Sequence, residues 1–112
     1  MKYHHQDLAN RRWQKLSLME QLANIGVEVE RTIKWRSKDE KSSQMAFFRA
    51  LELVDLTIAD LQSKKQWAKL KEICRLREVL VDYFFGENIY GSTNELWHKY
   101  FYPFNWAVRI EN

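Results

Sequence analysis

A chain of 112 residues with a net charge of +3 has the size of one domain, and three glycines and one proline leave little scope for hairpins. Its single cysteine excludes an internal disulfide and a multi-cysteine metal site. No apolar run approaches the ~18 residues of a membrane span, and the polar N-terminal segment lacks the hydrophobic run of a secretion signal. We therefore expect one cytoplasmic domain over residues 1–112.

The positive charge is concentrated at the N-terminal end of the chain. Residues 1–16 hold four basic residues and one acidic residue, whereas the remainder is neutral and mixed in charge. Residues 1–12 are predicted to form a flexible arm. Trp13 and Leu16, which follow, are expected to dock on the hydrophobic core.

The first predicted helix covers residues 18–35. Ser17 and Glu20 have the spacing of a capping box, in which each side chain accepts a hydrogen bond from the backbone of the other. Gly26 lies on the apolar side and predicts a close approach of another helix. The apolar stripe consists of Leu18, Leu22, Ile25, Val29 and Ile33.

The second predicted helix covers residues 44–61, after a polar loop at residues 37–42. Ser43 is the expected N-cap. The inner stripe consists of Phe48, Leu51, Val54, Ile58 and Leu61, and Met45, Phe47 and Leu56 widen it.

The third predicted helix covers residues 64–85 and begins at a second capping box, Ser63 and Gln66. So short a connection favours an antiparallel neighbour. Cys74 is expected to be a small buried hydrophobe, and Gly86 is expected to form a left-handed C-terminal cap. The core positions are Leu70, Ile73, Leu76, Leu80 and Phe84.

The fourth predicted helix follows a third capping box, Ser92 and Glu95. Trp97 and Phe101 are expected to close one end of the core, and Pro103 to kink or end the helix. The predicted fold is all-α: an antiparallel four-helix bundle with a short N-terminal arm and an aromatic C-terminal segment.

A set of charged residues lies among the apolar positions of the second and third helices. Paired carboxylates on facing helices could hold Mg²⁺, and this pattern is similar to that of small all-helical nucleotide pyrophosphatases of the MazG type. Glu28 and Glu30 match the clustered glutamates of that family poorly. We favour inter-helix salt bridges, no metal and no cofactor. The charge cluster consists of Arg49, Glu52, Asp55, Arg75, Arg77, Glu78 and Asp82.

Catalytic motifs are weak in this chain. Glu95 and His98 have the Glu-x-x-His spacing of di-iron bundles, which need two such motifs and two further glutamates. The motif occurs once, so we expect Glu95 to cap the helix. Neither Cys74 nor any serine has a recognisable base nearby in sequence, and we predict no catalytic residue.

Two surfaces are candidates for binding. Ten of the sixteen aromatic residues lie between residues 83 and 106, more than a small monomer is expected to bury. The predicted oligomer interface consists of Tyr100, Tyr102, Phe104 and Trp106. Cations around an aromatic ring favour a nucleic acid or acidic protein partner, although a solvated helix face has the same composition. The predicted partner-binding residues are Arg11, Arg12, Lys15, Lys64, Lys65, Trp67 and Lys69.

Three segments carry a resemblance: residues 13–28 (WQKLSLMEQLANIGVE), 49–58 (RALELVDLTI) and 76–86 (LREVLVDYFFG). Together they resemble a small family of uncharacterised bacterial proteins over residues 13–104, which implies no activity and no catalytic residue. In architecture the chain is also similar to helical-bundle accessory proteins that form rings and bind nucleic acid, such as those beside retroelement reverse transcriptases. Our hypothesis is a non-enzymatic homo-oligomer that binds a protein or nucleic acid and no membrane; the alternative is a Mg²⁺-dependent nucleotide pyrophosphatase.

Overall fold

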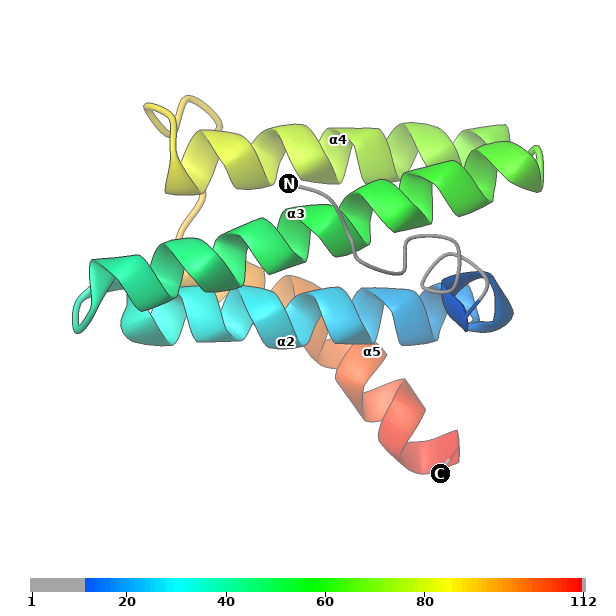
Figure 1. The fold of residues 1–112 in the computed structure, drawn as a ribbon, viewed down its shortest axis with the longest axis horizontal. Helices are drawn as coiled ribbons and strands as arrows, with labels where there is room; N and C mark the ends of the chain where they lie inside the picture. Colours follow the sequence, from blue (N-terminus) through cyan, green and yellow to red (C-terminus); the bar gives the residue numbers. More distant parts are fainter. Residues whose placement is uncertain (1–11, 112) are drawn as a thin grey trace.

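The protein is all-helical over residues 12–111, the part that the computed structural model describes (Figure 1). A helical turn at residues 12–15 precedes the long helices, and no strand occurs in the described part. None of the described helices combines the length and apolar character needed to cross a membrane. The predicted arm, residues 1–12, lies almost wholly outside the described residues. The long helices are α2 (Leu18–Arg36), α3 (Glu40–Ser63), α4 (Trp67–Phe84) and α5 (Asn94–Glu111).

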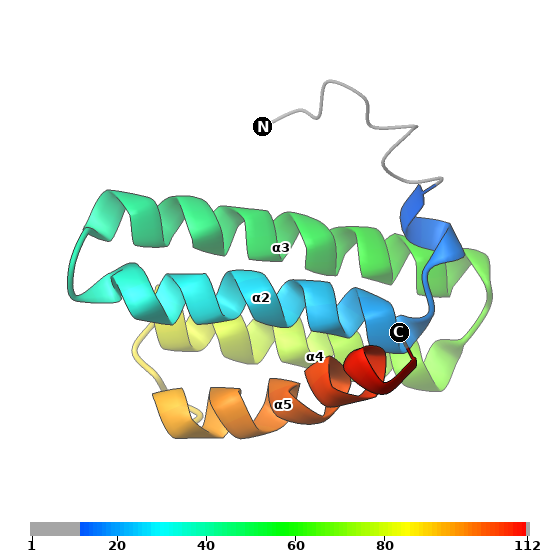
Figure 2. The same cartoon turned by 90° about the horizontal axis from the view of Figure 1, so that it is seen from below.

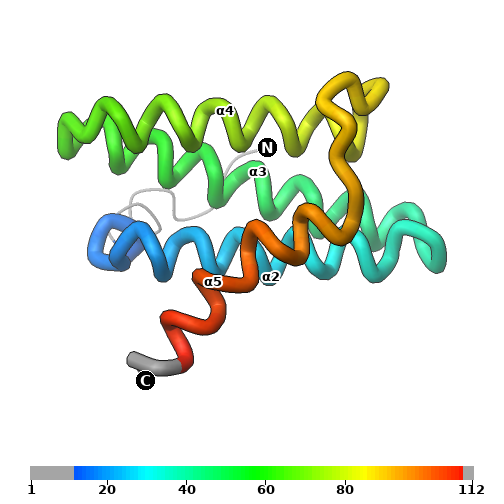
Figure 3. Tube along the Cα trace, turned by 180° about the vertical axis from the view of Figure 1, so that it is seen from behind, coloured from blue at the N-terminus to red at the C-terminus, as the bar shows by residue number. Residues whose placement is uncertain are grey.

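The four long helices surround one hydrophobic core. Helices α2 and α3 lie side by side along most of their length (Figures 1 and 2). Helix α4 packs against α3, whereas α5 packs against α2 (Figure 3). The last two helices therefore have different main neighbours although they are consecutive in the chain.

Helix α2 begins as predicted. The Ser17 hydroxyl accepts a hydrogen bond from the Glu20 backbone at 3.1 Å, and the Glu20 carboxylate accepts one from the Ser17 backbone at 2.9 Å. Gly26 also behaves as predicted, because a Cβ atom there would lie 3.0 Å from three side-chain atoms of Phe101 on α5. The absence of a side chain lets α5 approach α2 closely. Trp13 docks as expected, and its indole N–H donates to the Thr57 hydroxyl at 2.9 Å.

Helix α3 starts four residues earlier than predicted, because Asp39 caps it in place of Ser43. Hydrogen bonds from the Ser42 hydroxyl and backbone lower the pKa of the Asp39 carboxyl. The Ser43 hydroxyl instead donates to the Thr32 carbonyl at 2.8 Å, which joins α3 to α2. The inner stripe was also placed wrongly at one residue: Phe47 is buried, whereas its neighbour Phe48 is half exposed.

The turn between α3 and α4 differs from the prediction. Ser63 is the last residue of α3 and does not cap α4. The chain reverses through Lys65, whose φ of 56° is left-handed. The Lys65 and Gln66 backbones donate to the carbonyls of Gln62 and Leu61 at 3.1 and 3.0 Å, a pattern that satisfies the last carbonyls of a helix.

The C-terminal end of α4 is closed by a loop rather than by a left-handed glycine. Gly86 does not have a positive φ, so the predicted cap is wrong; Asn88 has a φ of 56° instead. The Asn88 backbone donates to the Asp82 carbonyl at 3.1 Å. A Cβ atom on Gly86 would lie 2.9 Å from the same oxygen, so glycine is needed here for its lack of a side chain.

Helix α5 starts one residue later than its predicted capping box allows. The Thr93 hydroxyl accepts from the Leu96 backbone at 3.1 Å, whereas the Ser92 backbone pairs with the Asn88 side chain. Pro103 does not end the helix, which continues to Glu111. Figure 2 shows the helix changing direction in its second half, as expected where proline removes one helical hydrogen bond.

Candidate functional site

The two predicted basic segments lie at the same end of the molecule, where α2 and α4 begin (right-hand end of Figure 1). Lys64 joins them, because its ammonium group donates to the Gln14 carbonyl at 3.1 Å. Arg11 lies outside the described residues. We call this surface the basic end; its described residues are Arg12, Lys15, Lys64, Lys65, Trp67 and Lys69.

A buried polar network beneath the basic end holds it in place. The Asp60 side chain is only 4% exposed and accepts hydrogen bonds from Gln21 Nε2 and Lys64 Nζ, both at 3.0 Å. Gln21 Nε2 also donates to the Trp13 carbonyl at 2.9 Å. The network therefore connects the N-terminal turn to α2 and α3. Gln21 and Asp60 were not predicted; the available signal was their position beside the apolar residues Leu22 and Leu61.

Trp67 and Lys65 are the most distinctive residues of the basic end. Trp67 is 61% exposed, more than any other tryptophan in the described chain. Lys65 adopts a left-handed conformation that costs a residue with a Cβ atom about 1 kcal/mol. Among the described cations of this end, Lys64 alone pairs with a carboxylate. Lys65 and Lys69, which lie two residues before and after Trp67 in the sequence, therefore leave their charges unpaired among the described residues.

Part of the predicted charge cluster connects neighbouring helices. Arg77 Nε donates to Asp55 Oδ1 at 2.8 Å between α4 and α3. Arg49 Nε donates to Glu28 Oε1 at 3.3 Å between α3 and α2. Both arginines remain substantially exposed, so solvent weakens these pairs.

The remaining charges of the α4 part of the cluster hold the loop that leads to α5. The Asp82 carboxylate accepts from the backbones of Ile89 and Tyr90 at 2.8 and 3.1 Å. Glu78 accepts from the Tyr90 hydroxyl at 2.8 Å, and this hydrogen bond raises the pKa of Tyr90. The Arg75 guanidinium lies 5.3 Å from the centre of the Tyr90 ring. These contacts give Arg75, Glu78 and Asp82 a role in loop closure.

The acidic faces do not meet in an array suited to Mg²⁺. Within residues 12–109, no three side chains of His, Cys, Asp or Glu gather closely enough to hold a metal ion. Asp55 is engaged by Arg77, and Asp82 by backbone N–H groups. Glu52 has one buried carboxylate oxygen without a hydrogen-bond partner among the described residues. The arrangement gives no support to the pyrophosphatase alternative.

Two residues considered for chemistry, Cys74 and His98, lie at the surface. Cys74 is exposed, so the prediction of a buried residue is wrong. Helix α4 buries Ile73, Leu76 and Leu80, and Cys74 is rotated about 100° away from Ile73 onto its outer face. His98 Nδ1 lies 2.6 Å from Glu30 Oε2 and joins α5 to α2.

The aromatic C-terminal residues divide into a buried and an exposed group. Trp97 and Phe101 are buried in the core, as predicted. Tyr100 and Phe104 pack against the core, and burial together with the Glu72 charge raises the pKa of Tyr100 to about 12. Tyr102 and Trp106 are 66% and 54% exposed. Only these two of the four predicted interface residues present most of their side chain to solvent.

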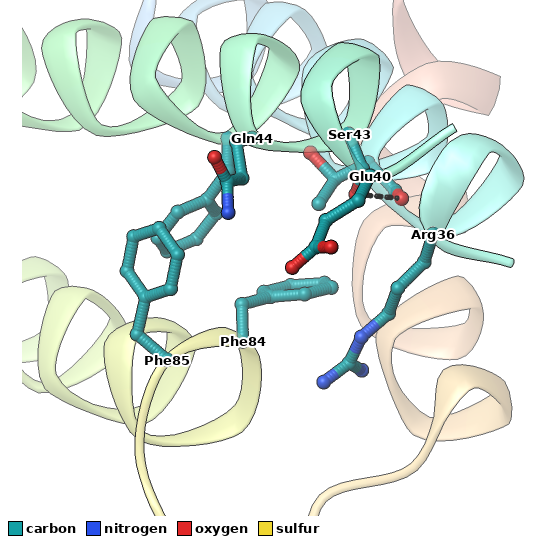
Figure 4. A pocket seen from close by; sticks show the side chains of 8 residues that line it. Arg36, Glu40, Ser43, Gln44, Phe84 and Phe85 are labelled. Atoms are coloured by element: carbon teal, nitrogen blue, oxygen red, sulfur yellow. Dashed lines mark hydrogen bonds between the residues drawn. The ribbon is translucent and has the colours of Figure 1, made fainter. Parts of the chain in front are cut away.

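Two hollows were not predicted from the sequence. A groove of about 220 Å³ lies between α4 and α5, lined by Glu72, Arg75, Leu76, Val79, Trp97 and Tyr100. A second hollow, of about 300 Å³, lies at the end opposite to the basic end, between the end of α2, the start of α3 and the end of α4 (Figure 4). Its lining includes Arg36, Glu40, Phe47, Phe84 and Phe85. The adjacent phenylalanines before Gly86 were the one sequence signal for it.

No family model, curated protein or solved structure matches this chain. The class of protein is therefore defined by the fold and the surfaces: an all-helical protein with a basic end and an aromatic last helix. The resemblance to a bacterial family and to accessory proteins of retroelements stays a prediction.

Proposed function

We propose that this protein is a non-enzymatic, cytoplasmic, antiparallel four-helix bundle that binds single-stranded nucleic acid at its basic end. The observation that carries the proposal is the exposure of Trp67, which lies between Lys65 and Lys69 in the sequence. Proteins hold single strands by stacking bases on aromatic rings while cations contact the phosphates. Arg12 and Lys15 lie at the same end and extend the positive surface.

The conformation of Lys65 supports a functional use of its side chain. Glycine fits the left-handed position without the steric cost that lysine bears there. Strained residues of this kind gather at binding sites, where their side chain serves a purpose other than stability. An acidic protein would also be attracted by the lysines, but the exposed indole favours a partner with stacking bases.

The first prediction separates binding from stability at the turn. Replacing Lys65→Gly is expected to raise the free energy of unfolding by roughly 0.5–1 kcal/mol, since the strain is removed. The same variant should bind fluorescein-labelled dT20 several-fold more weakly. Its slope of log K against log salt concentration should fall by roughly 0.7, the value of one lost phosphate contact on a single strand. Urea denaturation and fluorescence anisotropy measure the two effects.

Matched controls make this test specific. Trp67→Ala should weaken binding by about tenfold, in keeping with the loss of one stacked base. Lys38→Gly removes a cation from the turn at the opposite end and should leave affinity within a factor of two. Equal losses of affinity for Lys38→Gly and Lys65→Gly would mean that the nucleic acid is attracted only by the overall positive charge and not by the basic end. Binding of poly-glutamate without binding of dT20 would overturn the proposal in favour of an acidic protein partner.

We further propose that copies of the chain associate through Tyr102 and Trp106. Light scattering at about 100 µM should give a mass above the 13.6 kDa of one chain, because exposed aromatic side chains are enriched at subunit interfaces. The double change Tyr102→Ala and Trp106→Ala should reduce the mass to that of one chain. Phe48→Ala, at another half-exposed aromatic, should not. A monomeric wild-type protein would contradict this proposal and leave the nucleic-acid proposal intact.

A further inference from the structure

The hollow at the end opposite to the basic end is lined by three phenylalanines, and its other five lining residues are polar or charged. The Phe47 ring centre lies 5.0 Å from that of Phe84 and 4.9 Å from that of Phe85. The Phe47 and Phe85 planes meet at 89°, so the rings enclose a corner rather than a flat stack. The volume of about 300 Å³ is at the lower limit for small-ligand sites.

A carboxylate reaches into this hollow and has no partner there. In Figure 4 the Glu40 carboxylate lies over the Phe84 ring. It makes no hydrogen bond or ion pair with any side chain in the described part of the chain, although Arg36 lines the same hollow. The face of an aromatic ring carries partial negative charge, so an anion in this position gains nothing from the ring.

The Arg36 side chain contacts Tyr83 and Phe84 rather than Glu40. Its Nη2 donates to the Tyr83 carbonyl at 3.2 Å, and its guanidinium lies 4.9 Å from the Tyr83 ring centre and 5.1 Å from that of Phe84. Figure 4 shows this guanidinium and the Glu40 carboxylate on opposite sides of the Phe84 ring. The Arg36 guanidinium therefore does not cover the side of Phe84 that faces Glu40, and it lies 5.1 Å from the ring centre on the other side.

We propose that this hollow binds an organic cation, an alkylated ammonium or a guanidinium group, between the Glu40 carboxylate and the Phe84 ring. A cation there is attracted by the carboxylate and by the faces of the surrounding rings, as in aromatic cages that recognise quaternary ammonium groups. Two sources supply this chemistry: a small free cation, or the side chain of an arginine in another protein. The site lies away from the basic end and does not depend on the nucleic-acid proposal.

The test compares a cation with an uncharged molecule of the same shape. Choline is titrated into ¹⁵N-labelled protein beside 3,3-dimethylbutan-1-ol, in which carbon replaces the charged nitrogen. We expect choline to shift the side-chain amide signals of Gln44, which lines the hollow, with a millimolar dissociation constant. The neutral alcohol should bind at least fivefold more weakly. Agmatine and the peptide acetyl-Gly-Arg-Gly-amide form the second arm, and tighter binding of the peptide identifies a protein as the source.

Substitutions of two acidic residues, one in the hollow and one outside it, complete the test. Glu40→Gln keeps the size of the side chain and should weaken choline binding at least fivefold. Glu87→Gln removes a charge from the α4–α5 loop and should leave the affinity unchanged. The fold of each variant is checked from its amide spectrum. Equal binding of choline and the alcohol, unchanged affinity in Glu40→Gln, or no shift of Gln44 at 50 mM of any of these cations would each overturn the proposal.

Discussion

Replacing Phe101→Ala is expected to lower the free energy of unfolding by about 3–5 kcal/mol, the usual cost of removing a buried phenylalanine. The Phe101 side chain is 0% exposed. Its ring lies 6.1 Å from that of Trp97 and 4.9 Å from that of Tyr100, centre to centre. It also fills the space over Gly26 through which α5 contacts α2. Urea denaturation followed by circular dichroism measures the change.

The same contact makes Gly26 sensitive to a single methyl group. Alanine in an exposed helix position stabilises by about 1 kcal/mol relative to glycine. Gly26→Ala should instead destabilise by about 1–3 kcal/mol, because the new Cβ atom would lie 3.0 Å from three atoms of the fully buried Phe101 side chain. In a Phe101→Ala background, Gly26→Ala should cost less than in the unchanged protein but should still cost some stability, since alanine removes Cγ and Cδ1 of residue 101 and keeps the Cβ atom at 3.0 Å.

A substitution at the exposed neighbour of Phe101 serves as the control for these two predictions. Tyr102→Ala, next to Phe101 and 66% exposed, should change monomer stability by less than about 0.5 kcal/mol. Stabilisation of the otherwise unchanged protein by Gly26→Ala would contradict the close approach of α5 to α2. A comparable loss in Tyr102→Ala and Phe101→Ala would likewise contradict the burial of Phe101.

The positions of the long helices could be predicted because apolar spacing is a local property of the chain. The choice of cap was less predictable. Of the predicted caps, Ser17 alone serves, while Asp39 and Thr93 replace Ser43 and Ser92. A hydroxyl three residues before Glu or Gln is frequent, and which candidate caps depends on where the preceding turn closes. That closure is decided by tertiary contacts, such as the bond from Ser43 to the Thr32 carbonyl.

Single-residue burial was predicted less well than the helices. Phe47 and Phe48 are adjacent, and a rotation of about 100° decides which of them enters the core. Cys74 was misplaced because α4 buries only a narrow stripe of residues, and α3 is its main neighbour. The width of a buried stripe depends on how many helices cover it, which a sequence pattern does not specify.

The candidate sites were partly visible in the sequence. The lysines and Trp67 were found from their composition, but their meeting with the N-terminal turn depends on a bond from Lys64 to the carbonyl of Gln14. A contact between segments so far apart leaves no periodic signal. The hollow around Glu40 was missed for the same reason, because it is assembled from three helices.

Replacing Asp60→Ala is expected to lower the free energy of unfolding by about 2–4 kcal/mol. The carboxylate is the acceptor for both Gln21 Nε2 and Lys64 Nζ, at 3.0 Å each. Its removal leaves a buried amide N–H short of one acceptor, and such losses cost more than the hydrogen bond contributes. Lys64 recovers part of the loss, since its side chain is partly exposed and can return to water.

The comparison with a surface pair tests whether burial causes this effect. Asp55→Ala breaks the Arg77 pair, whose carboxylate is 55% exposed, and should cost less than about 1 kcal/mol. Asp60→Asn keeps an oxygen for Gln21 but loses the charge opposite Lys64. Its loss of unfolding free energy should lie between the losses of Asp55→Ala and Asp60→Ala. Hydrogen exchange of the Trp13 indole N–H should accelerate in Asp60→Ala, because Gln21 then no longer links Trp13 to α3. Equal losses in Asp60→Ala and Asp55→Ala would mean that the buried network does not anchor the basic end, and the N-terminal turn would have to be held by the packing of Trp13 and by the hydrogen bonds from Trp13 to Thr57 and from Lys64 to Gln14.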